Sequence, residues 1–264
     1  MFSFKIYKNT IKQMWKFWSV ITIGVLTLTI TMLVMFADNG GSHSPSETPE
    51  GTPIEINLYL MVLPQSFFGA TGIGYQLPII FIIIIGNRIL AAEVEKGYLS
   101  YLLSSPLSRN KIVTSKLLAF LTSVILYSVL TTIVGVVTLS ATGEGTMISF
   151  WLVNSLGLGL LLVTAAGISF LFSSIFDKGA LSLLVTSSIL GISIIFGMFG
   201  MLFETTLPAL ANLKYVSLNI LYDTTFIKYD DVGTWIGQYI GMLIISIGLF
   251  VGAVIYFKNK DLPL

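Results

Sequence analysis

The sequence predicts an all-α integral membrane protein with six transmembrane helices and both termini in the cytoplasm. Two observations indicate this fold class. First, 55% of the 264 residues are hydrophobic and only 10% are charged, whereas a soluble domain carries about 25% charged residues. Second, the chain contains apolar runs of roughly 20 residues, the length that a helix needs to cross ~30 Å of hydrocarbon. A chain of this composition belongs in a bilayer.

Six apolar runs are the candidate spans. They lie near residues 17–36, 67–87, 115–138, 150–173, 180–203 and 235–257. The segment 1–16 precedes the first run and carries four lysines at helical spacing, Lys5, Lys8, Lys12 and Lys16. This spacing predicts an amphipathic helix in the membrane interface, with its lysines towards anionic headgroups. A plain positive flank is the alternative, and it gives the same topology.

The distribution of charge sets the orientation, because Lys and Arg favour the cytoplasmic side of a membrane. With the amino terminus inside, 12 of the 14 basic residues are cytoplasmic and only Lys214 and Lys228 are external. The external segment 37–66 is rich in Gly, Ser, Pro and acidic residues, which predicts a flexible loop. The external segment 204–234 is more apolar. We expect it to form short helices that dip into the outer leaflet as a re-entrant region.

Several functional classes lack their signature in this chain. The interior of the six runs carries no charge, and Lys116 stands at the opening of the third run; transporters driven by protons or sodium normally hold a carboxylate within the membrane. The chain has no cysteine and only one histidine, His43, in the external loop. Neither an H-E-x-x-H motif nor a G-x-x-x-x-G-K-[ST] phosphate loop occurs. We therefore expect no catalytic, metal or cofactor site, and any ATP must be bound by another polypeptide.

The cytoplasmic segment 88–114 joins the second and third runs. Its apolar residues recur every fourth position, which predicts one apolar helical face: Leu90, Val94, Tyr98 and Leu102. Pro106 then ends the helix, because the residue before a proline is pushed out of the α region. Periodicity alone is equally compatible with a coupling surface for another subunit and with an interfacial helix that has no partner.

The residues of this segment favour the coupling surface. They form an E-x-E-x-G stretch, a leucine-rich helix that ends in Ser-Pro, and Ser-Arg ahead of a lysine, with the marker residues Glu93, Glu95, Gly97, Tyr98, Leu102, Pro106, Arg109 and Lys116. This order resembles the first cytoplasmic loop of type-two ABC transporter permeases, the kind that includes bacterial peptide and drug exporters. The six spans and internal termini resemble that family too. Tyr98 departs from the pattern, because members often have threonine there.

The resemblance implies a single transmembrane permease domain over residues 1–264. It makes the loop from Glu93 to Pro106 a coupling helix that fits a groove on a separate cytosolic ATPase subunit, where Glu93 and Glu95 would meet basic or polar groups. ATP and Mg would be bound by that subunit and not by this chain. A second, identical permease chain would complete a two-plus-two assembly in a bacterial cytoplasmic membrane. Membrane lipids are further partners, and no nucleic acid is implied.

The last run carries four glycines on nearly one helical face, in two small-x-x-x-small pairs: Gly237, Gly241, Gly248 and Gly252. Such residues let helix backbones approach closely. We expect them to pack against another helix of the same chain. An interface with a second chain is the alternative.

The fourth to sixth runs hold polar residues without charge: Asn154, Thr164, Ser169, Thr186, Ser187, Ser188 and Ser193. A path lined in this way suits amphipathic or lipophilic cargo better than ions or sugars. The leading hypothesis is an ABC exporter permease for such cargo. The resemblance to type-two ABC permeases, which include many bacterial peptide and antibiotic exporters, favours antimicrobial or toxin peptides or drugs. A membrane anchor or assembly protein that transports nothing is the alternative, and a secondary transporter comes third.

Overall fold

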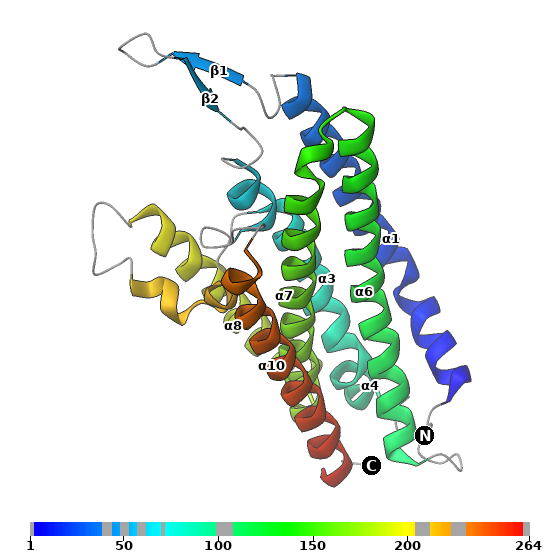
Figure 1. Ribbon diagram of the computed structural model, residues 1–264. Coiled ribbons are helices and arrows are strands. Elements are labelled where there is room, and N and C mark those ends of the chain that lie inside the picture. The colour runs from blue at the N-terminus through cyan, green and yellow to red at the C-terminus, as the bar shows by residue number, and fades with distance from the viewer. Residues whose placement is uncertain are drawn as a thin grey trace.

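A computed structural model describes residues 3–38, 44–47, 53–56, 62–69, 72–98, 108–203, 212–222 and 231–260. Within these residues, six helical segments are long and apolar enough to cross a membrane. The prediction of a helical membrane protein with six spans is thereby confirmed. The two ends of the chain lie at the same end of the helical bundle (Figure 1). We call this the basic end, because the charge count places most lysines and arginines there; the opposite end is the far end.

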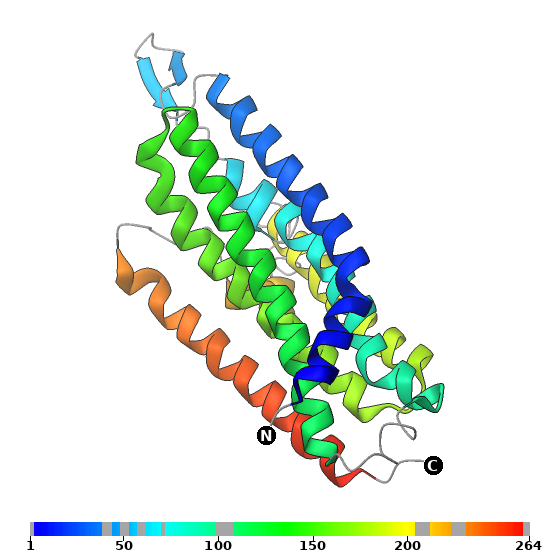
Figure 2. The same cartoon turned by 90° about the vertical axis from the view of Figure 1, so that its right-hand side faces the viewer.

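The first helix, α1 (Phe4–Asp38), contains both the expected interfacial segment and the first span. Its 35 residues extend over about 52 Å, which exceeds the hydrocarbon thickness. The helix is continuous, although Figure 2 shows that its first turns bend away from the rest. One face is buried along its length, at Ile6, Thr10, Met14, Trp18, Thr22, Val25, Thr29 and Leu33. This face packs on α6, where Trp18 Nε1 donates to the Ser123 carbonyl at 2.8 Å. The four lysines are exposed.

The second span is built from three pieces. A short π-helix, η2 (Pro64–Phe68), leads into α3 (Ile73–Ile89), and a five-residue helix, α4 (Ala91–Glu95), follows after a break at Leu90. The predicted run 67–87 corresponds to α3, which begins later because Gly72 is extended and starts the helix. The rings of Phe67 and Phe68 lie 5.2 and 5.0 Å from that of Trp151. These contacts anchor the far end of the second span to α7.

The remaining spans are long and regular. They are α6 (Arg109–Ala141), α7 (Ile148–Ile175), α8 (Gly179–Leu202) and α10 (Val232–Asn259), with the short η3 (Gly145–Met147) between α6 and α7. The most buried span is α7, which contacts α3, α6, α8 and α10. Close packing at its start leaves no room for a side chain at Gly135, because an added Cβ would lie 1.9 Å from Trp151 Cε2. The span α7 is therefore the centre of the bundle.

The described parts of the external segment 37–66 include regular structure that the composition did not suggest. Strands β1 (Ser44–Glu47) and β2 (Pro53–Ile56) pair antiparallel, with Ser44 opposite Ile56. Ile54 and Ile56 alternate with Glu55, the pattern of a strand, within a segment whose overall composition is that of a loop. The strand pair lies at the far end of the bundle (Figure 1).

The described parts of the segment 204–234 contain two 3₁₀-helices, η4 (Asn212–Val216) and η5 (Leu218–Leu221). Between them, Ser217 donates to the Ser193 carbonyl at 2.7 Å, and Ser193 Oγ accepts from the Leu218 N–H at 2.6 Å. Ser193 lies nine residues before the end of α8 at Leu202, which corresponds to about 14 Å of helix. This part of the chain therefore folds back alongside α8.

Candidate functional site

The break between α3 and α4 is the first element of the candidate site, which lies at the basic end. Leu90 has φ −124° and ψ −66°, well away from helical values. An uninterrupted helix would join the Ala91 N–H to the Asn87 carbonyl. Instead, the Ser173 hydroxyl of α7 accepts from the Ala91 N–H at 3.0 Å and donates to the Asn87 carbonyl at 3.3 Å. A side chain from a neighbouring span thus occupies the gap in the helix.

A buried ion pair joins the same region to α6. Lys116 Nζ pairs with the Glu93 carboxylate and also donates to the Ile89 carbonyl at 2.8 Å. The Lys116 side chain is 2% exposed and that of Glu93 is 18% exposed. A buried charge without a partner is strongly destabilising, so each member of this pair depends on the other. The two ends of the motif seen in the sequence, Glu93 and Lys116, therefore meet in space.

The second glutamate of the motif joins α4 to α8. A Glu95 carboxylate oxygen accepts from the Gly179 N–H at 2.7 Å, at the first residue of α8. The first N–H groups of a helix lack partners within it, and negative charge is favourable there. Gly179 also has little space, because an added Cβ would lie 2.8 Å from the same oxygen. The five residues of α4 are consequently bound to α6, α7 and α8 at once.

A second polar cluster at the basic end joins the ends of α6, α7 and α10. Lys260, just after α10, forms an ion pair with Asp177 at 2.6 Å and donates to the Ile175 carbonyl at 2.7 Å. The Lys260 carbonyl in turn accepts from Arg109 Nη1 at 2.8 Å. Arg109 opens α6 and Asp177 follows α7. The ends of α6, α7 and α10 are therefore held together by charge.

The structure places the predicted coupling residues as follows. Gly97 follows α4 with φ +72°, a conformation that favours glycine, and Tyr98 is 64% exposed. Leu102 and Pro106 lie outside the described residues. We expected Glu93 and Glu95 to contact the ATPase, but both carboxylates are bound to groups of this chain. Glu93 is partly buried, whereas Glu95, Lys96, Gly97 and Tyr98 are exposed, and contact of these residues with an ATPase stays a prediction.

Sequence reasoning did not find three residues of the site. Ser173, Asp177 and Lys260 lie far along the chain from α4, and no local pattern marks them. Asp177 and Lys260 could have been suspected, since each is a charged residue beside the end of a span. Ser173 is one of many serines in the spans, so its role depends on knowing which helix lies beside it.

The glycines of the last span do not pack within this chain. A Cβ added at Gly237, Gly241 or Gly248 would meet no atom within 4 Å, and one at Gly252 would meet only Leu171 Cδ1 at 3.9 Å. The expectation of close packing within the chain is therefore wrong for the part of it that the structure describes. The reason is that α10 buries its other face, at Tyr239, Met242, Ser246, Phe250, Ala253 and Phe257.

The polar residues of the spans serve mainly to join helices. Thr164 and Ser246 share a hydrogen bond of 2.8 Å between α7 and α10. Ser169 donates to the Ile82 carbonyl at 3.0 Å, which joins α7 to α3. Asn154 accepts from the Tyr222 hydroxyl at 3.0 Å, which anchors the segment after η5. These side chains therefore have hydrogen-bond partners on neighbouring elements, and Ser246 also lines the groove described next.

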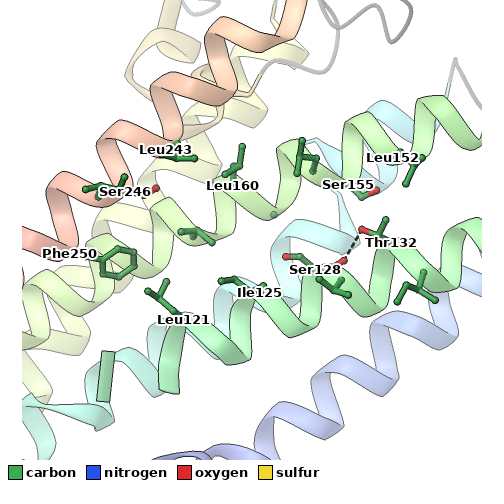
Figure 3. Close-up of a pocket in the computed structure, with 16 residues that line it drawn as sticks. Leu121, Ile125, Ser128, Thr132, Leu152, Ser155, Leu160, Leu243, Ser246 and Phe250 are labelled. Carbon is green, nitrogen blue, oxygen red and sulfur yellow. Dashed lines mark hydrogen bonds between the residues drawn. The ribbon is translucent and has the colours of Figure 1, made fainter. Parts of the chain in front are cut away.

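A groove of about 710 Å³ lies between α6, α7 and α10 (Figure 3). Its walls are aliphatic, and its polar lining consists of hydroxyls: Ser128, Thr132, Ser155 and Ser246. Two of these donate within α6, since Ser128 bonds to the Val124 carbonyl and Thr132 to that of Ser128. No charged side chain lines the groove, so its surface suits hydrocarbon.

The fold and this site define a multi-pass membrane protein whose spans are bound together around one short helix at the basic end. A family model described as ABC-2 family transporter protein matches residues 6–262, which is nearly the whole chain. The chain belongs to this family and is an ABC transporter permease, as the sequence motif predicted. It is a transmembrane subunit and not the catalytic one, and the family implies an ATP-binding partner. No curated protein and no solved structure matches the chain.

Proposed function

We propose that this chain is the permease of an ATP-driven exporter and that α4, with the residues after it, is the segment that receives force from a separate ATP-binding subunit. The observation that carries the proposal is the set of bonds around α4. Glu93 is paired with α6, the Ala91 N–H is bound to α7, and Glu95 is bound to α8. A push on this segment would therefore move three spans together.

The charges around α4 support a surface for a protein partner. Lys96, Gly97 and Tyr98 are exposed at its end, and so is Glu95, one carboxylate oxygen of which accepts from the Gly179 N–H. The Tyr98 side chain is 64% exposed, and tyrosine is enriched at the core of protein interfaces. We assign the contact with the ATP-binding subunit to these residues, and the transmission of force to Glu93 and Glu95.

The assembly would contain two permeases of this sequence and two ATP-binding subunits, with ATP and Mg bound by the latter. The membrane would be the bacterial cytoplasmic membrane, with the basic end inside. The cargo we propose is amphipathic or hydrophobic, with a peptide or drug favoured. The polar side chains of the described spans form helix contacts, and the groove holds hydroxyls without charge, which accords with uncharged or apolar cargo.

The first experiment is purification of the full chain from its native membranes in mild detergent, with identification of co-purified proteins and an assay of ATP hydrolysis. We expect a stoichiometric partner with a phosphate loop. Tyr98→Ala should reduce the amount of partner retained, and Glu93→Gln should reduce hydrolysis while the partner stays bound. The matched control is Tyr256→Ala, because Tyr256 lies exposed in α10.

The outcome separates the functional classes. A chain that purifies alone and shows no hydrolysis would support a membrane anchor or a secondary transporter instead. Retention of the partner with full hydrolysis in a Glu93→Lys, Glu95→Lys double variant would sink the proposed transmission of force through α4.

A further inference from the structure

The break at Leu90 contradicts the local sequence. Sharp bends in helices almost always arise at proline, at Gly/Ser pairs, or where a side chain or water enters the hydrogen-bond ladder. The stretch from Asn87 to Glu95 reads NRILAAEVE and contains no proline, glycine or serine. Alanine, leucine and glutamate are among the strongest helix formers. The local sequence therefore favours one helix that continues from α3 through α4.

The interruption comes from two other spans. The Ser173 hydroxyl of α7 lies between the Asn87 carbonyl and the Ala91 N–H, which a continuous helix would join. The Ile89 carbonyl would accept from the Glu93 N–H in a continuous helix. Here it accepts from Lys116 of α6, while the Glu93 N–H donates to the Leu90 carbonyl at 3.0 Å. Two side chains thus satisfy the groups that the break sets free.

We propose that Ser173 and Lys116 are positioning residues that hold the junction of α3 and α4 bent, against a local sequence that favours a straight helix. The junction has two arrangements, a bent one held by these side chains and a continuous one in which the backbone satisfies itself. The last step rests on the proposed function: the bend sets the direction in which α4 meets the ATP-binding subunit, and straightening it releases α4 from α6 and α7.

The buried environment explains how two side chains can outweigh helix propensity. Ser173 and Lys116 are 0% and 2% exposed, so neither can replace its backbone partners with water. A buried polar group left without a partner is destabilising, and a buried charge without a partner is more so. The helix propensity gained at the one junction residue, Leu90, is the smaller effect.

The test measures the bend directly in the full chain. Since the chain contains no cysteine, spin labels can be attached at Ile80→Cys in α3 and Lys96→Cys after α4, both exposed. Their distance distribution is then measured in lipid nanodiscs without ATP. In a continuous helix the two Cα atoms, 16 residues apart, would be separated by about 24 Å. We expect Ser173→Ala to shift the distribution from the native value towards this length.

The matched control is Ser174→Ala. Ser174 is the next residue of the same helix, but its hydroxyl donates to the Leu171 carbonyl within α7 at 2.6 Å. This variant should keep the native distribution. Lys116→Met, where this variant folds, is expected to shift the distance distribution further than Ser173→Ala does. An identical distribution for Ser173→Ala and Ser174→Ala would overturn the assignment of Ser173, whatever Lys116→Met does.

The second readout is Mg-ATP hydrolysis by the complex purified with its partner. Ser173→Ala should lower hydrolysis severalfold, and Ser174→Ala should not. A shifted distance with unchanged hydrolysis would establish the bend and overturn its part in coupling. The distance is measured on the chain alone, so it tests the bend whether or not an ATP-binding partner is found. Absence of such a partner would count against the proposed function only.

Discussion

The short helix α4 and the last span α10 carry the two motifs that stand out in the sequence, and the two motifs have different surroundings. Glu93 and Glu95 of α4 bond to other groups of the chain, and their contact with a partner subunit stays a prediction. The glycines of α10 were expected to pack within the chain, yet a Cβ added at Gly237, Gly241 or Gly248 would meet no described atom of another element within 4 Å. A motif therefore identifies residues that make contacts. Only the fold shows whether a contact lies within the chain.

The largest change in stability is expected when the ion pair between Glu93 of α4 and Lys116 of α6 is broken. Glu93→Gln leaves the buried Lys116 ammonium without its counter-charge, so we expect the free energy of unfolding to fall by about 3–5 kcal/mol. Lys116→Met should also destabilise, and the double variant should lose less than the sum of the two. Equilibrium unfolding in mixed micelles, arranged as a double-mutant cycle, measures this coupling.

The control for this cycle is Lys258→Met, which removes an exposed lysine from the last turn of α10. Its effect should stay within about 0.5 kcal/mol. Additive effects of Glu93→Gln and Lys116→Met would mean that the two charges do not interact. The ion pair would then contribute nothing to holding α4 against α6.

The second largest change in stability is expected from a comparison of two glycines within the spans, Gly135 of α6 and Gly241 of α10. Gly135→Ala places a Cβ 1.9 Å from Trp151, and such overpacking should cost about 1–3 kcal/mol. A Cβ added at Gly241 would meet nothing within 4 Å among the described residues, so Gly241→Ala should stabilise by up to about 1 kcal/mol, because alanine is the better helix former. Thermal unfolding of the purified chain, followed by tryptophan fluorescence, compares the two. A loss for Gly241→Ala as large as that for Gly135→Ala would show that the glycine face packs against another molecule in the sample.

The smallest effect concerns the bond from α4 to α8. Glu95→Gln keeps an acceptor for the Gly179 N–H but removes the charge at the start of α8, so we expect a loss of about 0.3–1 kcal/mol. Salt screens interactions of exposed charges, and the difference between the native chain and the variant should therefore shrink as NaCl is raised. A difference that is independent of salt would assign the role of Glu95 to its hydrogen bond alone.

The regular parts of the fold could be predicted because they depend on short stretches of chain. The predicted spans 115–138 and 150–173 lie inside α6 and α7, and 180–203 matches α8 except for its last residue, since crossing a membrane requires a continuous apolar run. The break at Leu90 could not be predicted in this way. Its local residues favour a helix, and its cause is a serine more than 80 residues away.

The candidate site was predictable only in part for the same reason. The motif placed Glu93, Glu95 and Lys116 in one functional segment, and the ion pair between the first and the last joins its two ends. The roles of Ser173, Asp177 and Lys260 depend on which helices lie side by side. Apolar spans can pack in many orders with similar burial, so composition does not choose among them.

By itself, the sequence determined that this protein crosses a membrane six times, that positive charge gathers on one side, and that the chain lacks a phosphate loop. These are properties of composition and of apolar length, which add up along the chain. Only the tertiary structure decided that α4 is bound to three spans and that the α10 glycines face outward. Those outcomes depend on which buried polar group finds which partner, because a bilayer offers no water to replace a missing one.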